Sequence, residues 1–137
     1  MYCAYLFQIP ESINWLISLK ELCIKGTPVK ELPLSTSSLP CLANFLAGGC
    51  RFLKQVPSSV GGLNFLLELE LDYTPIETLP EEIGDLRVIR KLWLRNCQSL
   101  KVLPESIGNM GTLLSLYLGG SNIEKLPENF GKLENLG

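Results

Sequence analysis

The sequence predicts an α/β solenoid: a right-handed superhelix with a curved parallel sheet on its concave face and short helical or 3₁₀ turns on its convex face. Prolines that follow an aliphatic residue recur every 23 or 24 residues, at Pro10, Pro33, Pro57, Pro80, Pro104 and Pro127. A strand-like pattern precedes each proline from Pro33 on, and a helix-like pattern follows each. Such a period is typical of an array of one small unit, so we expect surface recognition rather than catalysis.

The segment before each proline alternates apolar and polar residues, as a strand with one buried face does. The inward pairs are Leu22/Ile24, Phe45/Ala47, Leu69/Leu71, Leu92/Leu94 and Leu116/Leu118. We expect strands near residues 20–25, 43–48, 67–72, 90–95 and 114–119, in a single domain over residues 1–137. Each strand with its connector makes one coil. About five repeats are complete, and partial repeats at both ends are expected of a piece of a longer protein.

The segment after each proline places apolar residues three and six positions later in nearly every coil, which suits one helical or 3₁₀ turn. Proline can open such a turn, because its missing N–H would be unbonded there anyway. Gly61, Gly84, Gly108 and Gly131 are expected to let the chain leave the turn. The connector Leu34–Ser38 lacks the acidic residue and the glycine, so we expect local fraying there.

The true repeat is a pair of coils. Cys3, Cys50 and Cys97 lie 47 residues apart at the turn after the strand, and Thr27, Thr74 and Ser121 occupy this turn in the alternate coils. Neighbouring strands lie about 4.8 Å apart, so cysteines two coils apart are roughly 10 Å from each other, too far for a disulfide. We therefore expect Cys3, Cys50 and Cys97 to be small buried residues that close the turn. Cys23 and Cys41 are expected to be free thiols.

Composition argues against several functional classes. Twelve basic and fourteen acidic residues give a net charge of −2, too balanced to indicate a nucleic-acid or anionic-membrane partner. The chain has no histidine, which removes His-based catalytic triads and Cys/His zinc sites. Prolines and glycines interrupt the best apolar run, so no transmembrane helix is expected. No Asn-x-Ser/Thr sequon occurs, which favours an intracellular protein. We therefore expect no enzyme, no metal, and no nucleic-acid or membrane partner.

The outward residues of the predicted strands form the candidate partner-binding surface: Leu46, Glu70, Lys91, Trp93, Arg95 and Tyr117. Glu68 opposite Lys91, and Asp72 opposite Arg95, are expected to form ordinary cross-strand pairs that contribute under ~1 kcal/mol each if exposed. This arrangement also argues against Glu68 and Glu70 as a catalytic carboxylate pair. Trp93 and Tyr117 are adjacent aromatics on an open face, and their residue types are enriched in binding hot spots.

The frame LxxLxLxx(C/T/S)xxLxxLP, with connectors such as PESIG and PENFG, resembles a leucine-rich repeat. The LxGxIP motif of extracellular plant repeats is absent, and no complete unit carries the turn Asn of intracellular Ras-group repeats. The alternation of NCQSLKVLPESIG (96–108) with GGSNIEKLPENFG (119–131) is similar to the repeat domain of plant TIR–nucleotide-binding–leucine-rich-repeat (TIR-NBS-LRR) disease-resistance proteins. The resemblance covers nearly the whole chain.

This resemblance implies a recognition module of a plant intracellular immune receptor, cytoplasmic or nucleo-cytoplasmic, with a role in effector sensing and defense signalling. The implied partners are a pathogen effector or a guarded host protein, together with the other domains of a full-length receptor. No GxxxxGK(S/T) phosphate loop occurs, so the ADP or ATP binding of such receptors does not extend to this chain, and no cofactor is expected. Two alternatives stay open: a non-catalytic scaffold of the Ras-group type, and a gene fragment without independent function.

Overall fold

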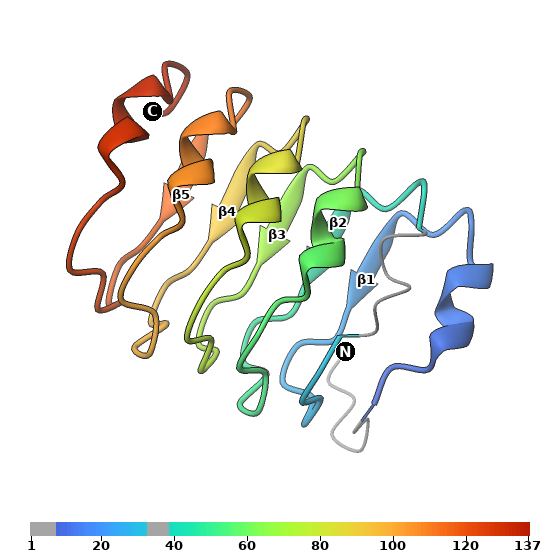
Figure 1. Ribbon diagram of the computed structural model, residues 1–137. Helices are drawn as coiled ribbons and strands as arrows, with labels where there is room; N and C mark the ends of the chain where they lie inside the picture. The colour runs from blue at the N-terminus through green and yellow to red at the C-terminus, as the bar shows by residue number, and fades with distance from the viewer. Residues whose placement is uncertain (1–7, 33–38) are drawn as a thin grey trace.

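Five parallel strands lie side by side in one sheet, in the order of the sequence. The computed structural model describes residues 8–32 and 39–137. Its sheet order is β1-β2-β3-β4-β5, with β1 (Glu21–Cys23), β2 (Asn44–Leu46), β3 (Glu68–Glu70), β4 (Lys91–Trp93) and β5 (Ser115–Tyr117). Figure 1 shows the strands along one side of the molecule and 3₁₀ turns along the other. Parallel strands in sequential order require one full coil of chain per strand, so the predicted solenoid is confirmed.

The pairing between coils extends beyond the strands themselves. Each strand spans three residues, which is shorter than the segments expected from the sequence. Past the ends of β3 and β4, the Leu71 N–H still donates to the Trp93 carbonyl over 2.9 Å, and the Tyr73 N–H donates to the Arg95 carbonyl over 2.8 Å. The turn after each strand therefore stays aligned with the turn of the next coil.

Each described connector forms a single 3₁₀ turn on the face opposite the sheet. These turns are η1 (Glu11–Trp15), η3 (Ser58–Gly62), η4 (Glu81–Asp85), η5 (Glu105–Asn109) and η6 (Glu128–Lys132). A proline precedes each one, and Pro80, with φ −70° and ψ 152°, is representative. The Pro80 carbonyl accepts the Ile83 N–H over 3.0 Å. Proline suits this place because an N–H here would have no partner within the turn.

The glycines of these connectors differ from their predicted role. Gly61, Gly84 and Gly108 all lack a positive φ, so they do not supply the left-handed residue that ends many helices. They are sites of close approach between stacked turns instead. A Cβ on Gly84 would lie 2.5 Å from the Ser106 carbonyl oxygen, and one on Gly61 would lie 2.7 Å from the Glu82 carbonyl oxygen. A larger residue would push these coils apart.

The core is a column of aliphatic side chains between the sheet and the 3₁₀ turns. Leu69, Leu71, Leu92 and Leu94 point inward from β3 and β4 and from the residues just after them, and all are fully buried. Ile83 closes the same layer from the opposite face and is also fully buried. Each coil buries its apolar layer against the layers of its neighbours, so the coils depend on one another for a core.

Thr and Cys alternate at the turn that closes each strand, and they contact each other in pairs. The Cys97 thiol donates to the Leu71 carbonyl over 3.1 Å, and its sulfur lies 3.6 Å from the Thr74 hydroxyl oxygen. Cys50 makes the same two contacts with the coil of β1. We call these contacts the Thr–Cys joints. They link the coil of β1 to that of β2, and the coil of β3 to that of β4.

A second kind of contact links the other neighbouring coils, on the segments that return from the turns. Isolated parallel bridges pair Gln55 with Thr78 and Val102 with Lys125. These return bridges link the coil of β2 to that of β3, and the coil of β4 to that of β5. Within residues 8–32 and 39–137, no pair of coils carries both kinds of contact. The 47-residue double step of the sequence thus corresponds to two alternating contacts between coils.

Part of the cysteine pattern can be compared with the structure. Cys3 and the second connector, Leu34–Ser38, lie outside the described residues. The other four cysteines are free thiols: Cys50 and Cys97 are buried at the turns, and Cys23 and Cys41 are exposed. These four positions agree with the predicted registers.

We expect a maleimide to label Cys23 and Cys41 in the folded protein and to leave Cys50 and Cys97 unlabelled. Burial raises the pKa of the Cys50 and Cys97 thiols above the ordinary value of 9.0, so the reactive thiolate is scarce near neutral pH. Mass spectrometry of peptides after brief labelling measures the pattern. Labelling in urea, where all four thiols should react, is the control. Equal labelling of Cys97 and Cys23 in the folded protein would contradict the burial.

Candidate functional site

The outward residues of the five strands share one face of the sheet. Their register forms a central row of Cys23, Leu46, Glu70, Trp93 and Tyr117. The row beside it consists of Glu21, Asn44, Glu68, Lys91 and Ser115. We call the surface made by these two rows the concave face. The structure therefore brings five of the six candidate residues onto one surface, and the sixth, Arg95, lies two residues beyond the end of β4.

Trp93 and Tyr117 form a stacked aromatic pair on the concave face. Their ring centroids are 3.9 Å apart, and the ring planes differ by 13°. The Arg95 guanidinium carbon lies 4.9 Å from the centroid of the Trp93 ring and 5.9 Å from that of Tyr117. These three distances place the guanidinium beside the stack and nearer to Trp93, within the range of a cation–π contact with that ring. The sequence predicted the neighbouring aromatics but not this third partner.

Asp72 is the anchor of Arg95. One carboxylate oxygen of Asp72 accepts the Arg95 backbone N–H over 2.7 Å. The other accepts the Arg95 Nε–H over 2.8 Å and lies 2.7 Å from Nη2. The predicted pairing of Asp72 with Arg95 is confirmed. The Asp72 residue is only 2% exposed, so the limit of ~1 kcal/mol for an exposed pair does not apply to it. Hydrogen bonding to the carboxylate raises the pKa of Arg95 above its usual range, and Arg95 stays charged.

The two carboxylates of β3, Glu68 and Glu70, also pair with cations. Lys91 Nζ lies 2.9 Å from Glu68 Oε1, as the strand register predicted. The hydrogen bond to Glu68 raises the pKa of Lys91. Lys25 Nζ lies 2.6 Å from Glu70 Oε2, although β2 separates their coils. This contact is possible because Gly48 stands between them, where a Cβ would lie 2.6 Å from Glu70 Oε1.

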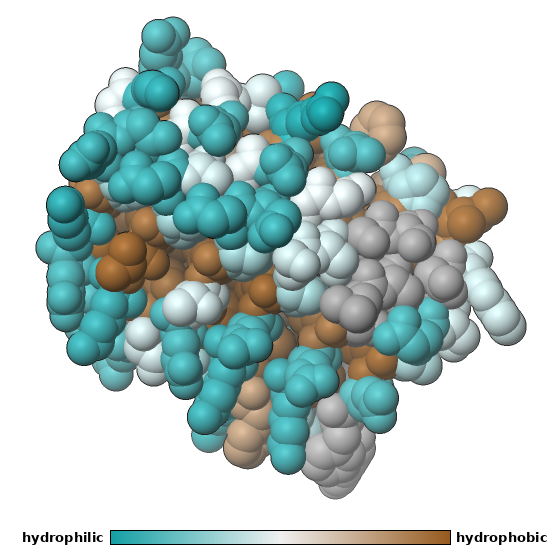
Figure 2. Space-filling model, in the orientation of Figure 1, coloured by the Kyte–Doolittle hydropathy of each residue, from teal (hydrophilic) through white to brown (hydrophobic). Residues whose placement is uncertain are grey.

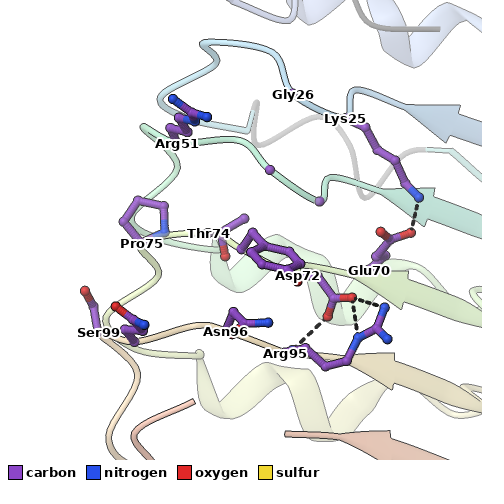
Figure 3. A pocket seen from close by; sticks show the side chains of 14 residues that line it. Lys25, Gly26, Arg51, Glu70, Asp72, Thr74, Pro75, Arg95, Asn96 and Ser99 are labelled. Carbon is purple, nitrogen blue, oxygen red and sulfur yellow. Dashed lines mark hydrogen bonds and ion pairs between the residues drawn. The ribbon is translucent and has the colours of Figure 1, made fainter. Parts of the chain in front are cut away.

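A groove crosses the turns that follow β1 to β4, beside the concave face. Its volume is about 980 Å³. Gly26, Gly48 and Gly49 line it together with Tyr73, and the Glu70 carboxylate covers Gly48 on its way to Lys25. Figure 3 shows the Lys25–Glu70 and Asp72–Arg95 pairs near the strand ends, with Arg51 farther from the strands. We call this feature the turn groove.

Sequence reasoning placed Lys25 among the outward residues but missed Arg51 and Tyr73 as parts of this surface. Both lie in turns, whose positions the strand pattern does not predict. One signal was present for Tyr73: the repeat places it where the coils of β1, β2 and β5 have Gly26, Gly49 and Gly120. An aromatic residue at a glycine position indicates a turn with a special role.

The arrangement suits contact with another molecule better than chemistry. Glu68 and Glu70 are each occupied by a lysine. In the part of the chain that the structure describes, no group of three His, Cys, Asp or Glu side chains could hold a metal ion. The same residues contain no helix long and apolar enough to cross a membrane. What the surface offers is paired charges around a half-exposed aromatic pair.

The opposite face of the molecule has a different character. Figure 2 shows hydrophilic side chains along most of the face that carries the 3₁₀ turns, with hydrophobic patches between them. Trp15, in η1, is 80% exposed, and so it provides an aromatic reference residue far in sequence from the Trp93–Tyr117 pair.

Comparisons with known proteins agree with this architecture. A family model described as a leucine-rich repeat region matches residues 58–137. A sequence search among curated proteins gives no match. The leucine-rich repeat domain of the type III effector XopL is similar in fold alone, with 22% identity and a TM-score of 0.67 over 98% of this chain and 65% of that one.

Two receptor structures are more similar in sequence. The Arabidopsis receptor kinase HAESA, solved in complex with the peptide hormone IDA and the co-receptor SERK1, has 29% identity and a TM-score of 0.73. The PEPR1–AtPEP1 structure has 28% identity and a TM-score of 0.74. Each alignment covers 94% of this chain, but only 22% of the HAESA chain and 19% of the PEPR1 structure's chain. This chain thus spans about a fifth of their length.

We expect Asp72→Ala to destabilise the fold by about 2 kcal/mol, because it leaves the Arg95 N–H without its acceptor and removes a charge-assisted bond. The matched variant Glu68→Ala removes a carboxylate from a pair whose side chains are 43% (Lys91) and 32% (Glu68) exposed. It should destabilise by under ~1 kcal/mol. Urea unfolding followed by circular dichroism measures both. Equal effects would show that burial of Asp72 does not distinguish the pairs.

Proposed function

Because the chain belongs to the leucine-rich repeat family, we propose that it is a protein-recognition module whose partner binds on the concave face. Leucine-rich repeat domains are typically non-catalytic. The observation that carries the proposal is the Trp93–Tyr117 stack with Arg95 beside it. Trp, Tyr and Arg are the residue types most enriched in binding hot spots. All three are held in this arrangement by contacts within the chain.

Preorganisation strengthens this proposal. Side chains that must be ordered by a partner lose rotamer freedom on binding, which weakens the complex. Here the Asp72 carboxylate fixes Arg95, and Arg95 in turn lies beside the aromatic pair. A partner therefore meets a surface whose largest side chains are already in place.

We further propose that the module belongs to a plant intracellular immune receptor of the TIR-NBS-LRR type. In this role it would sense a pathogen effector or a guarded host protein in the cytoplasm or nucleus. Similarity to the Arabidopsis receptor kinase HAESA supports a plant receptor. The alternation of two turn types every 47 residues supports the narrower class, because it carries the sequence resemblance and corresponds to real alternating contacts.

We expect Trp93→Ala to raise the Kd for a protein partner by about 30-fold, which corresponds to about 2 kcal/mol for a hot-spot aromatic. The far-ultraviolet circular dichroism spectrum should stay unchanged, because Trp93 lies on the outward face of the sheet. Surface plasmon resonance against a panel of purified effectors and host proteins measures the change.

The matched control is Trp15→Ala, which removes the same side chain from the 3₁₀ face and should leave the Kd unchanged. If Trp93→Ala binds as tightly as the unmodified chain does, Trp93 does not belong to the interface.

A further inference from the structure

Tyr73 adopts a backbone conformation that aromatic residues rarely take. Its φ is +57°, in the left-handed region where the Cβ of an L-residue is crowded. The matching residues of the other coils also have positive φ: Gly26, Gly49, Asn96 and Gly120. Glycine and asparagine tolerate this region better than any bulky residue does. Tyr73 therefore destabilises its own turn relative to a glycine in the same place.

The contacts of Tyr73 within the described residues do not offset this strain. The residue is 62% exposed, so its ring gains little from burial. Its backbone N–H donates to the Arg95 carbonyl, but a glycine would make the same bond, as Gly49 does with the Asp72 carbonyl. A strained residue that adds little to the fold is a candidate for a functional role.

The turn groove supplies a place for that role. Tyr73 lines it together with the backbone of Gly26 and Gly49 and with the Lys25–Glu70 pair. Backbone without side chains lets a second chain approach closely. The exposed Tyr73 ring thus lines the turn groove, where another molecule can lie against it.

The charges of the turn groove are unequal. Its lining holds three cations and two carboxylates, and each carboxylate, Glu70 and Asp72, pairs with a cation inside the groove. Arg51 is exposed, and no ion pair joins it to another described residue. The residues at the same place in the adjacent coils are Pro28 and Pro75, which carry no charge. The groove thus offers one positive charge to a ligand.

We propose that the turn groove binds an extended segment of a protein partner, with an apolar or aromatic side chain packed against Tyr73 and an acidic side chain paired with Arg51. This inference rests on the proposed function and specifies the kind of segment that the protein recognises. It adds a subsite at the turns to the Trp93–Tyr117 pair on the strands.

The dimensions of the groove set the length and spacing of the segment. The groove crosses four coils spaced by about 4.8 Å, so it is roughly 14 Å long and holds about four extended residues. Arg51 lies one coil from Tyr73 and two residues farther along its turn, a separation of roughly 8 Å. Alternate residues of an extended chain point to the same side about 7 Å apart. The apolar and acidic side chains are therefore expected two positions apart.

Because Tyr73 is strained, the first test predicts that one substitution will both stabilise the fold and weaken binding. Tyr73→Gly should raise Tm by about 3 °C, because the strain is relieved. It should also raise the Kd for a groove-binding peptide about tenfold, because the packing surface is lost. A Tm below that of the unmodified chain would show that Tyr73 supports the fold and would overturn the functional reason for its strain.

The probe is a library of random octapeptides displayed on phage and panned against the chain of residues 1–137. We expect enriched sequences to carry Asp or Glu two positions from an aromatic or large aliphatic residue. The most enriched peptide is then synthesised, and its Kd is measured by calorimetry. Tyr73→Gly and Arg51→Gln should each weaken it about tenfold.

Two matched controls should leave the Kd unchanged. Phe65→Ala removes an aromatic side chain of equal exposure (63%) outside the groove, and Lys54→Gln removes an exposed cation outside it. Enriched peptides without acidic residues, or binding that is lost in Trp93→Ala but not in Tyr73→Gly and Arg51→Gln, would overturn the groove inference and leave the proposed function standing. The absence of any enriched peptide would overturn the groove inference, whereas the proposed function is tested separately by the effect of Trp93→Ala on the binding of whole proteins.

Discussion

The structure depends on one constraint: each coil must stack on the next at the spacing of hydrogen-bonded strands, about 4.8 Å. Every inward position in a coil then packs against the matching position of the next one, so the core consists mainly of aliphatic residues such as Leu69 and Leu92, both fully buried. The constraint acts on the opposite face as well, where Gly61 and Gly84 leave room for the carbonyl groups of the following turn. Side chains on the outward face are free of these demands, and this is where the chain varies.

On the outward face of β3 and β4, negative charges are balanced by positive charges within the protein. The carboxylates of β3 and of the turn after it are each paired with a cation of the same protein, at Lys25, Lys91 and Arg95. A partner that approaches this surface meets little net charge, so long-range steering contributes little to the rate of association. Affinity must come from close packing on the aromatic pair, which acts mainly on the rate of dissociation. The fixed charges instead restrict which partners fit, because an unmatched charge placed against them would be desolvated without compensation.

Most of the fold could be predicted because the period of the sequence reports the stacking directly. The facing of Glu68 and Lys91, and the neighbouring rings of Trp93 and Tyr117, follow from register alone. Other features depend on what is absent from a position or on backbone conformation, and register does not reveal these. Glu70 reaches Lys25 because Gly48 has no side chain. Asp72 is buried because its carboxylate accepts a backbone N–H of the next coil. Tyr73 takes a left-handed conformation because the turn geometry repeats in every coil whatever residue occupies it.

The alternation of Thr–Cys joints with return bridges has a consequence for how such a chain can grow. If two coils (47 residues) are duplicated, Thr–Cys joints and return bridges still alternate along the array. A duplication of one coil would place two turns of the same type in contact, so that a thiol meets a thiol or a hydroxyl meets a hydroxyl, and the return segments would be out of step by one residue. Duplications within the gene should therefore be retained when they add an even number of coils, and the length of the array should change by two coils at a time.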